Sequence, residues 1–533
     1  MKLKLFFLLI PFFIFSQNIN WESREDLNTE NKYHYQTSYN NLKNSLSESS
    51  KPLKGIEISL PIDGRIFEKF TFYKQNPFSK ELSEKFSQIE IFTGQSNESN
   101  KKAFISIIDQ RVNITILDNY KKYVLINSKN KNIFILNSGI EIEKIKTSDI
   151  FDDMIDHHDH DHDQKKNFRE QSLSTISFSP KVKKYRLAIV TTAEWSNYFV
   201  DLYDAKDKDN DFKKAIVLAE IGTVVSALNT VTERDLGLTF ELVFGVQDLI
   251  EFDTNSDGLT NGDKFKTINE GHQIIINRIG ANNFDIGHSF YAGGGGLAGV
   301  GVICSGGKAR GTSGGYSGLG FHFVFAHEIG HMLGAVHTFN NAEGYGADGN
   351  MVETAAGATI MGYGERKERN LYYHAISIKE ISQTVKNASC GSFLTNQNND
   401  LPKYVSDPAK KSFSIPAGTP FALGKTFEIT DANNNYTDLL FNWDQMDAYE
   451  ITVNPPLNTS LKGPTFISLF PDNQKVRYFP DIETILSGKT ANEWEVVPQL
   501  SRNLNFTFTV RDNNTNGGSV LQDDFFIQTK YSD

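Results

Sequence analysis

The chain has 533 residues, of which 39% are hydrophobic and 12% aromatic. This composition is sufficient for packed cores and excludes wholesale disorder, and the length predicts about three or four domains. The formal net charge of −11 excludes a general basic surface for nucleic acid and otherwise indicates only a well-solvated surface.

The N-terminus has the pattern of a secretion signal. Lys2 and Lys4 precede the apolar run 5–15, and Ser16 offers a small residue for cleavage. A membrane anchor is the alternative, but about eleven apolar residues are too few to span a bilayer. We read no later stretch of the sequence as long and apolar enough to cross a bilayer. We therefore expect residues 1–16 to be a signal peptide and the protein to be secreted and extracellular, without a membrane span.

Residues 17–151 are predicted to form a β-rich domain. Runs of alternating apolar and polar residues are separated by Asn, Gly and Asp, as in strands joined by turns. The clearest runs are 55–60, 103–108 and 112–117. Because this region lies between the signal and the residues that carry the chemistry described below, we expect it to be a propeptide.

Residues 152–184 are charged, rich in Ser and without apolar periodicity, which predicts a linker and maturation region. Residues 156–163 consist only of His and Asp. Such a tract either binds metals weakly or forms a solvated acidic spacer. The candidate cleavage positions for maturation are Lys165, Lys166, Lys181, Lys183 and Lys184.

Residues 185–394 are predicted to combine strands and helices. We expect a buried first strand at 186–191, a helix at 212–234 and an alternating strand at 238–244. The Gly-rich run 297–303 is either the edge strand of the sheet or a flexible loop. A second helix is expected at 321–336.

The stretch from His327 to His337, His-Glu-Ile-Gly-His-Met-Leu-Gly-Ala-Val-His, is the most informative in the chain. On the second helix, His327 and His331 lie one turn apart on the same face, where both rings can reach one Zn²⁺. Glu328 points toward a metal-bound water and suits a general base. Gly334 permits the turn that ends the helix. His337 then becomes the third ligand and leaves the fourth position open, as in a catalytic site. A buried helix with incidental histidines would not explain this pattern.

At these residues the chain resembles the metzincin metallopeptidases. Those proteins have a methionine turn after the third histidine, and Met361 in Ala-Thr-Ile-Met-Gly-Tyr-Gly matches it. The resemblance implies an apolar floor beneath the zinc, whereas alone Met361 would be read as ordinary core. Within the metzincins, residues 185–393 resemble reprolysin-like secreted bacterial peptidases, including the segments 233–237 and 293–296.

Two residues call for comment within this resemblance. Reprolysins usually follow the third histidine with an Asp that braces the active site, but Thr338 stands there. Tyr363, two places after Met361, matches a tyrosine that assists the zinc in astacins and serralysins. It is therefore either a mobile zinc ligand or oxyanion donor, or a tyrosine of the pocket wall.

The resemblance implies a zinc-dependent endopeptidase that hydrolyses peptide bonds of extracellular proteins. His327, His331 and His337 would hold one catalytic zinc, Glu328 would act as the base, and the edge strand would pair with an extended substrate. The enzyme would be made as a zymogen. No Cys precedes the catalytic region, which excludes a cysteine switch, so one hypothesis is that the tract 156–163 blocks the zinc.

Two readings compete with a peptidase. A noncatalytic surface adhesin would keep zinc for structure, but a structural site needs no base and usually closes all four positions. A zinc amidase, or another hydrolase of nonpeptide bonds, is disfavoured only by the methionine turn.

A second metal site is considered in the same region. Asp253, Asn255 and Asp257 resemble the opening of a calcium loop, but Lys264 stands where the loop requires Glu. The segment is either a Ca²⁺ site or a surface turn rich in Asp and Asn. His288 is predicted to be a structural histidine rather than a fourth zinc ligand.

The chain has two cysteines, Cys304 and Cys390. In an exported protein the oxidising compartment favours a disulfide between them, and the alternative is two free thiols. The bridge would close a loop that contains the zinc helix and the methionine turn.

Residues 395–533 are predicted to form a separate β-sandwich of immunoglobulin-like type. Short strand runs at 421–423, 439–443 and 506–510 are separated by Pro, Gly, Asn and Asp. This module would bind a surface or polymer, the substrate, or only the peptidase itself. The predicted fold class is α+β: a metzincin-like domain with a mixed twisted sheet and a zinc helix, preceded by the β-rich propeptide and followed by the sandwich.

Overall fold

The computed structural model describes residues 19–29, 32–48, 55–63, 66–99, 101–118, 121–127, 130–141, 154–155, 176–177, 181–316, 319–340, 350–354, 356–363, 371–395, 399–405, 411–432, 439–449, 453, 455–513 and 518–531. The predicted signal peptide, the tract 156–163 and Lys165–Lys166 lie outside these residues. The chain forms two compact units, Met1–Asn76 with Phe86–Glu141 and Pro77–Lys85 with Ile142–Asp533.

The first unit is a single antiparallel sheet of nine strands in the order β1-β2-β9-β8-β7-β6-β5-β4-β3. Its strands are β1 (Glu22–Ser23), β2 (Lys32–Gln36), β3 (Ile56–Asp63), β4 (Ile66–Gln75), β5 (Ile89–Ser96), β6 (Lys102–Ile108), β7 (Arg111–Leu117), β8 (Lys121–Asn127) and β9 (Ile133–Glu141). They are accompanied by the short 3₁₀ helix η1 (Glu25–Leu27) and by α1 (Tyr39–Ser47). The three strand runs expected from alternation lie in β3, β6 and β7.

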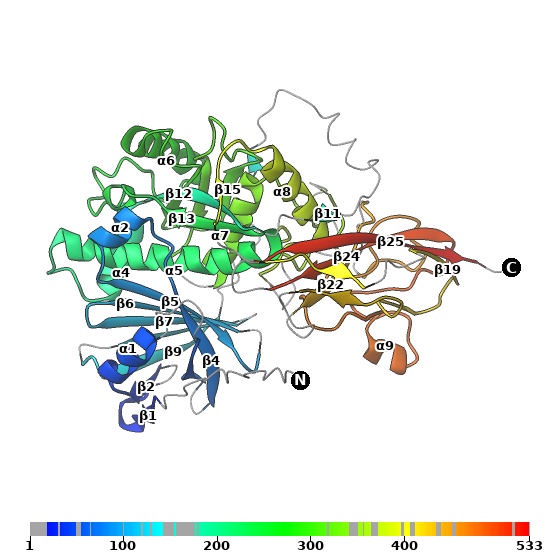
Figure 1. Cartoon of the computed structure of the whole chain (residues 1–533), viewed down its shortest axis with the longest axis horizontal. Coiled ribbons are helices and arrows are strands. Elements are labelled where there is room, and N and C mark those ends of the chain that lie inside the picture. Colours follow the sequence, from blue (N-terminus) through cyan, green and yellow to red (C-terminus); the bar gives the residue numbers. More distant parts are fainter. Residues whose placement is uncertain are drawn as a thin grey trace, which may run out of the picture. The chain divides into compact units, whose positions relative to one another are not determined.

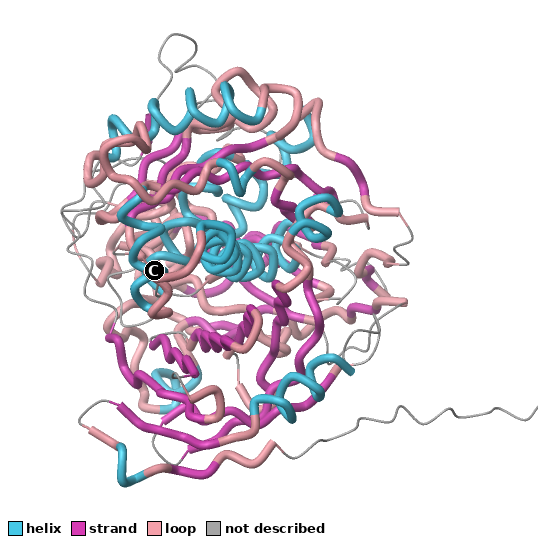
Figure 2. The backbone as a smooth tube through the Cα atoms, turned by 90° about the vertical axis from the view of Figure 1, so that its left-hand side faces the viewer, coloured by secondary structure: helices cyan, strands magenta, loops and turns pink. Residues whose placement is uncertain are grey.

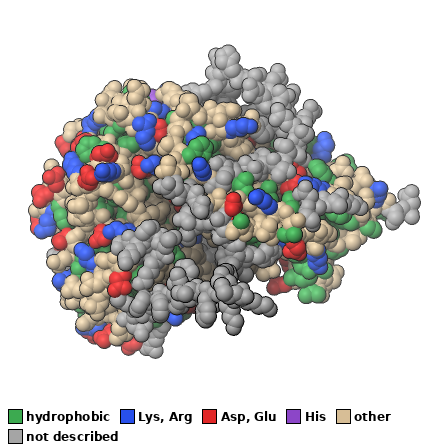
Figure 3. Space-filling model, viewed as in Figure 1, with side chains coloured by type: hydrophobic (Ala, Val, Ile, Leu, Met, Phe, Trp, Pro, Cys, Tyr) green, Lys and Arg blue, Asp and Glu red, His purple; other side chains and the backbone are tan. Residues whose placement is uncertain are grey.

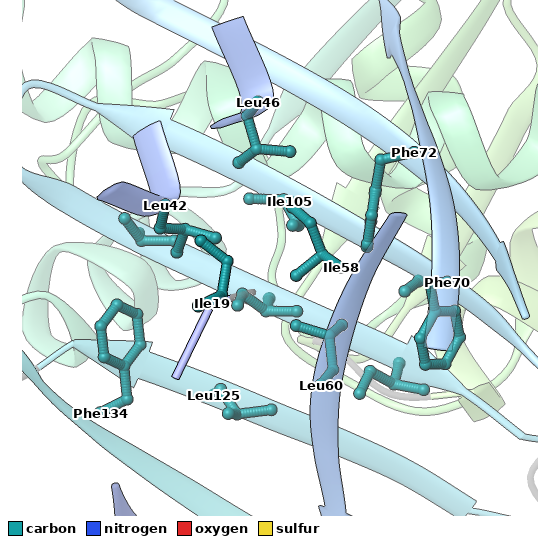
Figure 4. Close-up of a cluster of buried hydrophobic side chains, with 14 of the residues drawn as sticks. Ile19, Leu42, Leu46, Ile58, Leu60, Phe70, Phe72, Ile105, Leu125 and Phe134 are labelled. Atoms are coloured by element: carbon teal, nitrogen blue, oxygen red, sulfur yellow. The ribbon is translucent and has the colours of Figure 1, made fainter. Parts of the chain in front are cut away.

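The core of the first unit lies between α1 and the sheet. Leu42 and Leu46 of α1 are fully buried and point onto the same cluster as Ile58 and Ile105 of the sheet (Figure 4). α1 begins after Ser38, whose hydroxyl accepts a hydrogen bond from the backbone N–H of Asn41, a standard N-cap. The prediction of a β-rich N-terminal region is therefore confirmed.

The second unit contains a sheet in the order β10-β15-β16-β14-β12-β13, with β17 paired to β12. Its strands are β10 (Met154–Ile155), β12 (Lys183–Thr191), β13 (Leu238–Leu242), β14 (Ile286–Tyr291), β15 (Gly296–Gly299), β16 (Gly311–Gly314) and β17 (Ser392–Phe393). β13, β12, β14 and β16 are mutually parallel, whereas β15 runs antiparallel to β16. The expected mixed sheet is thus present.

The helices that accompany this sheet are α2 (Lys80–Lys85), α4 (Ala193–Leu202), α5 (Asn210–Leu236), α6 (Lys264–Ile279), α7 (Leu319–Met332) and α8 (Ala375–Asn387), with the 3₁₀ helix η4 (Val246–Asp248). α5 runs lengthwise in Figure 1 and is seen nearly end-on in Figure 2. It begins after Asp209, which caps the N–H of Phe212, and ends at Gly237 with φ of 60°. By composition α5 is long and apolar enough to cross a membrane, contrary to our reading of the sequence, but 94% of its apolar window is buried inside the protein.

Several predicted boundaries in this unit differ from the structure: the strand expected at 186–191 begins at Lys183, the helix expected at 212–234 spans Asn210–Leu236, and the strand expected at 238–244 ends at Leu242. Two further differences have a local cause. The second helix ends at Met332 rather than at 336, because the chain must turn at Gly334 to bring His337 back. The edge strand ends at Gly299 rather than at 303, because the following turn hydrogen-bonds to the end of α7: Gly301 donates to the carbonyl of His331 at 2.8 Å.

Part of the predicted propeptide belongs to the second unit. Leu242 of β13 donates its N–H to the carbonyl of Pro77 at 2.7 Å, and Ser79 donates to the carbonyl of Leu242 at 2.8 Å. Phe78 between them forms a parallel bridge with Leu242 and is buried. Residues 77–85 therefore extend the side of β13 that faces away from β12.

The structure also restricts the candidate cleavage positions. Lys183 and Lys184 lie in β12, where they pair with Leu238 and Thr239 of β13. A peptidase needs an extended, unpaired segment, so a cut at either lysine would require the strand to separate first. Lys181 is exposed and precedes the strand, and it is the better candidate of the three.

The C-terminal part of the second unit is built from strands. β11 (Ile176–Ser177), β25 (Val520–Lys530), β24 (Arg502–Arg511) and β22 (Leu440–Gln445) form one sheet, which β19 (Ser412–Pro416) joins at β25. Two further pairs are β18 (Lys403–Tyr404) with β21 (Ile429–Thr430) and β20 (Phe421–Leu423) with β23 (Arg477–Phe479), and α9 (Ile482–Leu486) follows β23. Aromatic residues from these strands, including Trp443, Phe479 and Phe508, share one buried core. The expected β-rich region is present, and its immunoglobulin-like type stays a prediction.

On the face shown in Figure 3, basic and acidic side chains are interspersed rather than gathered into a patch of one sign. Among the described side chains on this face, the lysines and arginines do not form a broad patch.

Candidate metal centre and active site

Three histidines converge where α7 ends. His327 and His331 lie on successive turns, and their Nε2 atoms are 3.0 Å apart. Gly334 has φ of 107°, a left-handed conformation that favours glycine, and it turns the chain back. His337 is thereby brought to the other two, so that one ligand atom from each histidine lies within 4.8 Å of the others. All three side chains are buried, and no other metal-holding group of this kind occurs among the described residues.

The hydrogen bonds of the first two histidines fix which ring nitrogen carries the hydrogen. His327 Nδ1 lies 2.6 Å from the carbonyl of Ile360, and His331 Nδ1 lies 2.8 Å from the carbonyl of Ala335. A carbonyl only accepts, so each Nδ1 carries the hydrogen and each Nε2 carries a lone pair. Two lone pairs facing each other at 3.0 Å repel unless a cation lies between them. The donor set therefore fits Zn²⁺, whose imidazole ligands commonly donate Nδ1–H to a carbonyl.

Glu328 lies against the edge strand of the sheet. Its side chain is 1% exposed, and a Cβ built on Gly296 of β15 would lie 2.6 Å from its Cγ and from its Cδ. Only glycine leaves room for the carboxylate at this point of the strand. β15 and the candidate base therefore line the same site, as the edge-strand interpretation requires.

Met361 packs against α7 at Gly330, which lies in sequence between His327 and His331. It is fully buried, and a Cβ built on Gly330 would lie 2.5 Å from its sulfur. The preceding residue, Ile360, supplies the carbonyl that accepts from His327 Nδ1. The methionine turn thus shapes the site by packing and by one backbone acceptor.

A buried carboxylate that the sequence did not reveal braces the turn after His337. Glu353 is 2% exposed and accepts hydrogen bonds from the hydroxyls of Thr338 at 2.6 Å and Thr359 at 2.5 Å. It also accepts from the backbone N–H of Ala358 at 2.9 Å. Thr338 occupies the position where reprolysins have Asp. In this chain the carboxylate belongs to Glu353, and Thr338 donates a hydrogen bond to it.

Tyr363 stands beside the third histidine. Its ring centroid lies 5.0 Å from that of His337 and 4.2 Å from that of Phe339, on which it stacks. Its side chain is 3% exposed, and its N–H donates to the carbonyl of Ala356 at 2.7 Å. The tyrosine is therefore close to the metal centre, within a small apolar cluster.

A disulfide joins Cys304 to Cys390, with their Cα atoms 5.6 Å apart and 86 residues between them in sequence. The predicted pairing is confirmed. The closed loop contains the zinc helix, His337 and the methionine turn. The bridge therefore restricts the conformations that these segments can adopt when the chain is unfolded.

A family model described as metallo-peptidase family M12B, reprolysin-like, matches residues 218–338. The match includes α5 from residue 218 onward together with β15 and α7, and it ends one residue after His337. The chain therefore contains a reprolysin-like zinc metalloendopeptidase domain of the metzincin class. The match confirms the family that the zinc motif and the methionine turn indicated.

Other comparisons add little to this assignment. The crystal structure of metalloproteinase-II from Bacteroides fragilis has 12% identity and a TM-score of 0.36, and the alignment covers 65% of this chain and 95% of that chain. A structure of a chaperone–substrate complex has 11% identity and a TM-score of 0.25, with 52% and 38% covered. TM-scores of this size establish neither a shared fold nor a shared activity. No curated protein matches the chain.

The calcium hypothesis is not supported. Asp253 accepts from both the side-chain amide and the N–H of Asn255, so its carboxylate is engaged within the loop. Asp257 is 3% exposed and caps the N–H of Ala193 at 2.8 Å. Among the described residues, the group of histidine and acidic side chains that could hold a metal does not include Asp253 or Asp257. The alternative, a surface turn rich in Asp and Asn, describes the segment better.

His288 is structural, as expected. It is fully buried in β14, and its Nε2 lies 2.9 Å from the hydroxyl of Ser313 on β16. Burial lowers the pKa of His288 to about 3, so the ring is neutral at neutral pH. It is not part of the group formed by His327, His331 and His337.

Proposed function

We propose that the metallopeptidase is secreted and cleaves internal peptide bonds of extracellular proteins, with Glu328 as general base. The observation that carries the proposal is the convergence of three buried imidazoles beside a buried carboxylate and a glycine strand. A structural zinc site would need neither the carboxylate nor the strand.

Bound zinc would lower the pKa of a water molecule and polarise the scissile carbonyl. Glu328 takes the proton of the attacking water and then delivers it to the departing amine. The Nδ1–H bonds of His327 and His331 hold their rings in the ligating tautomer through the reaction. Tyr363, 5.0 Å from His337 between ring centroids, is proposed to donate to the oxyanion as charge develops.

β15 is proposed to orient the substrate. An extended peptide that adds to this strand would form main-chain hydrogen bonds next to Glu328, since Gly296 lies against that carboxylate. Main-chain pairing gives affinity with little side-chain selectivity, which suits an enzyme that cuts many sequences.

The experiment is hydrolysis of unfolded casein by the processed protein, with products analysed by mass spectrometry. We expect fragments from internal bonds, complete inhibition by a zinc chelator and recovery on adding zinc. Removal of single terminal residues would indicate an exopeptidase. Zinc binding by a folded, processed protein that cuts no peptide bond would favour the amidase or adhesin readings.

We further propose that the chain is made as a zymogen, with residues 1–16 as the secretion signal. The support is β10: Met154 and Ile155 pair in parallel with Ala298 and Gly299 of β15, the strand proposed to receive substrate. A segment paired there would exclude an extended substrate. Cleavage after this segment, for example at Lys181, would release it.

Latency is tested with two variants of the unprocessed chain. Ile155→Pro removes a backbone donor from β10, and we expect it to raise the activity of the unprocessed protein. Replacement of residues 156–163 by Ser and Gly tests the tract separately: unchanged latency would dismiss the zinc-blocking hypothesis. If neither change raises activity, β10 does not maintain latency. Secretion is tested by comparing the medium of cells that express the chain with and without residues 1–16.

The C-terminal part is proposed to bind a surface or polymer in addition to its contacts with the peptidase. Exposed Leu457 and Leu461 on one of its loops motivate this proposal. Pull-down on insoluble polymers with Leu461→Ser as the comparison would test it, and equal retention of both proteins would count against a role for this loop.

A further inference from the structure

Residues 372–375, here called the brace segment, follow the methionine turn, end at the first residue of α8 and support the zinc helix. The hydroxyl of Tyr373 donates to the carbonyl of Ala326 at 2.7 Å, one residue before the first zinc ligand. The same ring packs beside the helix, since a Cβ built on Gly330 would lie 3.1 Å from Tyr373 Cε1. Tyr373 is fully buried. The position of α7 therefore depends on where the brace segment is held.

A second route runs from the brace segment to the same ligand. Ile360 donates its N–H to the carbonyl of Tyr372 at 3.0 Å. The carbonyl of Ile360 in turn accepts from His327 Nδ1 at 2.6 Å. A shift of the brace segment would thus move both the helix that carries His327 and the acceptor that orients its ring.

A fully buried arginine of the C-terminal part hydrogen-bonds to the brace segment. Arg511, the last residue of β24, donates from Nη2 to the carbonyl of Tyr373 at 3.0 Å and from Nε to Asp235 at 2.8 Å. Asp235, near the end of α5, accepts from the N–H of Tyr373 at 2.8 Å. Arg511 and Asp235 are both 0% exposed. Both the N–H and the carbonyl of Tyr373 are therefore hydrogen-bonded, which fixes the backbone of the brace segment.

Other residues of the C-terminal part hold the rest of the brace segment. Asp444 of β22 accepts from the N–H of Ala375 at 2.9 Å, and Gln522 of β25 donates to its carbonyl at 3.2 Å. The hydroxyl of Tyr372 donates to Ser468 at 2.8 Å. Strands β22, β24 and β25 and residue Ser468 of the C-terminal part thus all hydrogen-bond to the brace segment.

The two arginines at this junction determine the ionisation of Asp235. Burial alone would raise the pKa of Asp235, but the neighbouring charges of Arg234 and Arg511 outweigh it and keep that pKa below its usual value. Asp235 therefore remains ionised between two cations. Removing one partner of such a buried network is far more disruptive than removing an exposed ion pair.

We propose that the C-terminal part is a positioning element of the active site and that Arg511 is a positioning residue for the zinc ligand His327. It acts through Asp235 and the brace segment and does not touch the substrate. On this account the peptidase domain and the C-terminal part are one functional unit, and the C-terminal part is more than a tether or a binding module.

The test compares Arg511→Met with Lys379→Met in the full, processed chain. Lys379 on α8 contacts Asp524 at 2.8 Å and Thr507 at 3.1 Å in the C-terminal part, so it is a buried ionic contact at the same junction outside the two routes to His327. For each variant we would measure zinc loss to a chelator, kcat and KM on a peptide, and unfolding by urea. Zinc loss is measured independently of activity, so an error in the proposed reaction would not affect that result.

We expect Arg511→Met to lose zinc at least about tenfold faster and to lower kcat at least about tenfold, with KM within about twofold. Lys379→Met should change zinc loss and kcat by less than about twofold, even where it lowers stability. A folded Arg511→Met protein that matches Lys379→Met in both rates would overturn the proposal.

A second variant keeps the test decisive if Arg511→Met does not fold. Tyr373→Phe leaves the backbone contacts with Arg511 and Asp235 in place and removes only the hydrogen bond to Ala326. We expect zinc loss to be about threefold faster or more, with wild-type unfolding. Unchanged zinc loss and unchanged kcat in this variant would refute the route through the brace segment.

Discussion

Replacing Gly296 by alanine should disable the enzyme while leaving the metal site intact. A Cβ at this position would lie 2.6 Å from both Cγ and Cδ of Glu328, whereas carbon atoms in contact are ordinarily about 3.5–4.0 Å apart. Either the carboxylate or β15 must therefore move by about 1 Å. A displacement of that size at a catalytic group costs on the order of 100-fold in rate, which corresponds to about 2.7 kcal/mol of transition-state stabilisation.

The assay is steady-state cleavage of a quenched-fluorescent peptide, with bound zinc and thermal unfolding measured on the same samples. We expect kcat to fall about 100-fold, zinc content to remain that of the wild type, and stability to fall by about 1–3 kcal/mol from overpacking. Gly306→Ala is the matched control, since a Cβ there meets nothing within 4 Å. A folded, zinc-loaded Gly296→Ala enzyme with kcat within about threefold of wild type would refute the assignment of Glu328 and β15 to one site.

Three other variants test the supports of the site. Removing the disulfide with Cys304→Ser and Cys390→Ser should lower the free energy of unfolding by about 4–5 kcal/mol, given the 86-residue separation; a loss below about 1 kcal/mol in urea titrations would mean that the bridge contributes little. Glu353→Ala should cost roughly 3 kcal/mol of stability, because the Thr338 and Thr359 hydroxyls and the Ala358 N–H lose their acceptor, and Glu353→Asp should retain more of both stability and kcat. His288→Phe should flatten the acid side of the stability profile of the zinc-free protein. The pKa of His288 is lowered to about 3 in the folded state, so its contribution is fully present above its unfolded pKa of about 6.5 and is lost as pH falls toward 3, by on the order of 4 kcal/mol. Parallel pH profiles for wild type and His288→Phe would contradict this reasoning.

The zinc motif could be read from the sequence because its chemistry is local. Residues one helical turn apart on α7 share a face whatever surrounds them, and a glycine two residues after the helix allows the return of His337. The long helix α5 and the strands β12 and β13 were likewise predictable, because α5 has apolar residues largely at helical spacing, β12 is a short apolar run and β13 alternates.

The supports of the site could not be read in the same way. Glu353 acts on Thr338 across a loop, and Arg511 reaches Asp235 from another sheet, so neither contact has a sequence spacing that signals it. The calcium interpretation is not supported because the side chains that match the loop pattern have other partners: Asp253 accepts from Asn255, and Asp257 accepts from the N–H of Ala193. The edge strand was placed too long because its glycines continue into a turn that only the packing against α7 reveals.

Zinc binding and peptide cleavage can be separated by comparing two variants with the wild type. We would titrate zinc into the metal-free processed wild type, Glu328→Gln and His337→Ala, and measure cleavage of casein at each zinc occupancy. The account predicts that Glu328→Gln binds one zinc as tightly as wild type, within about threefold, but cleaves at least about 1,000-fold more slowly. His337→Ala should bind zinc far more weakly. If Glu328→Gln retained wild-type cleavage, or if His337→Ala bound zinc as tightly as wild type, the proposed centre would be wrong.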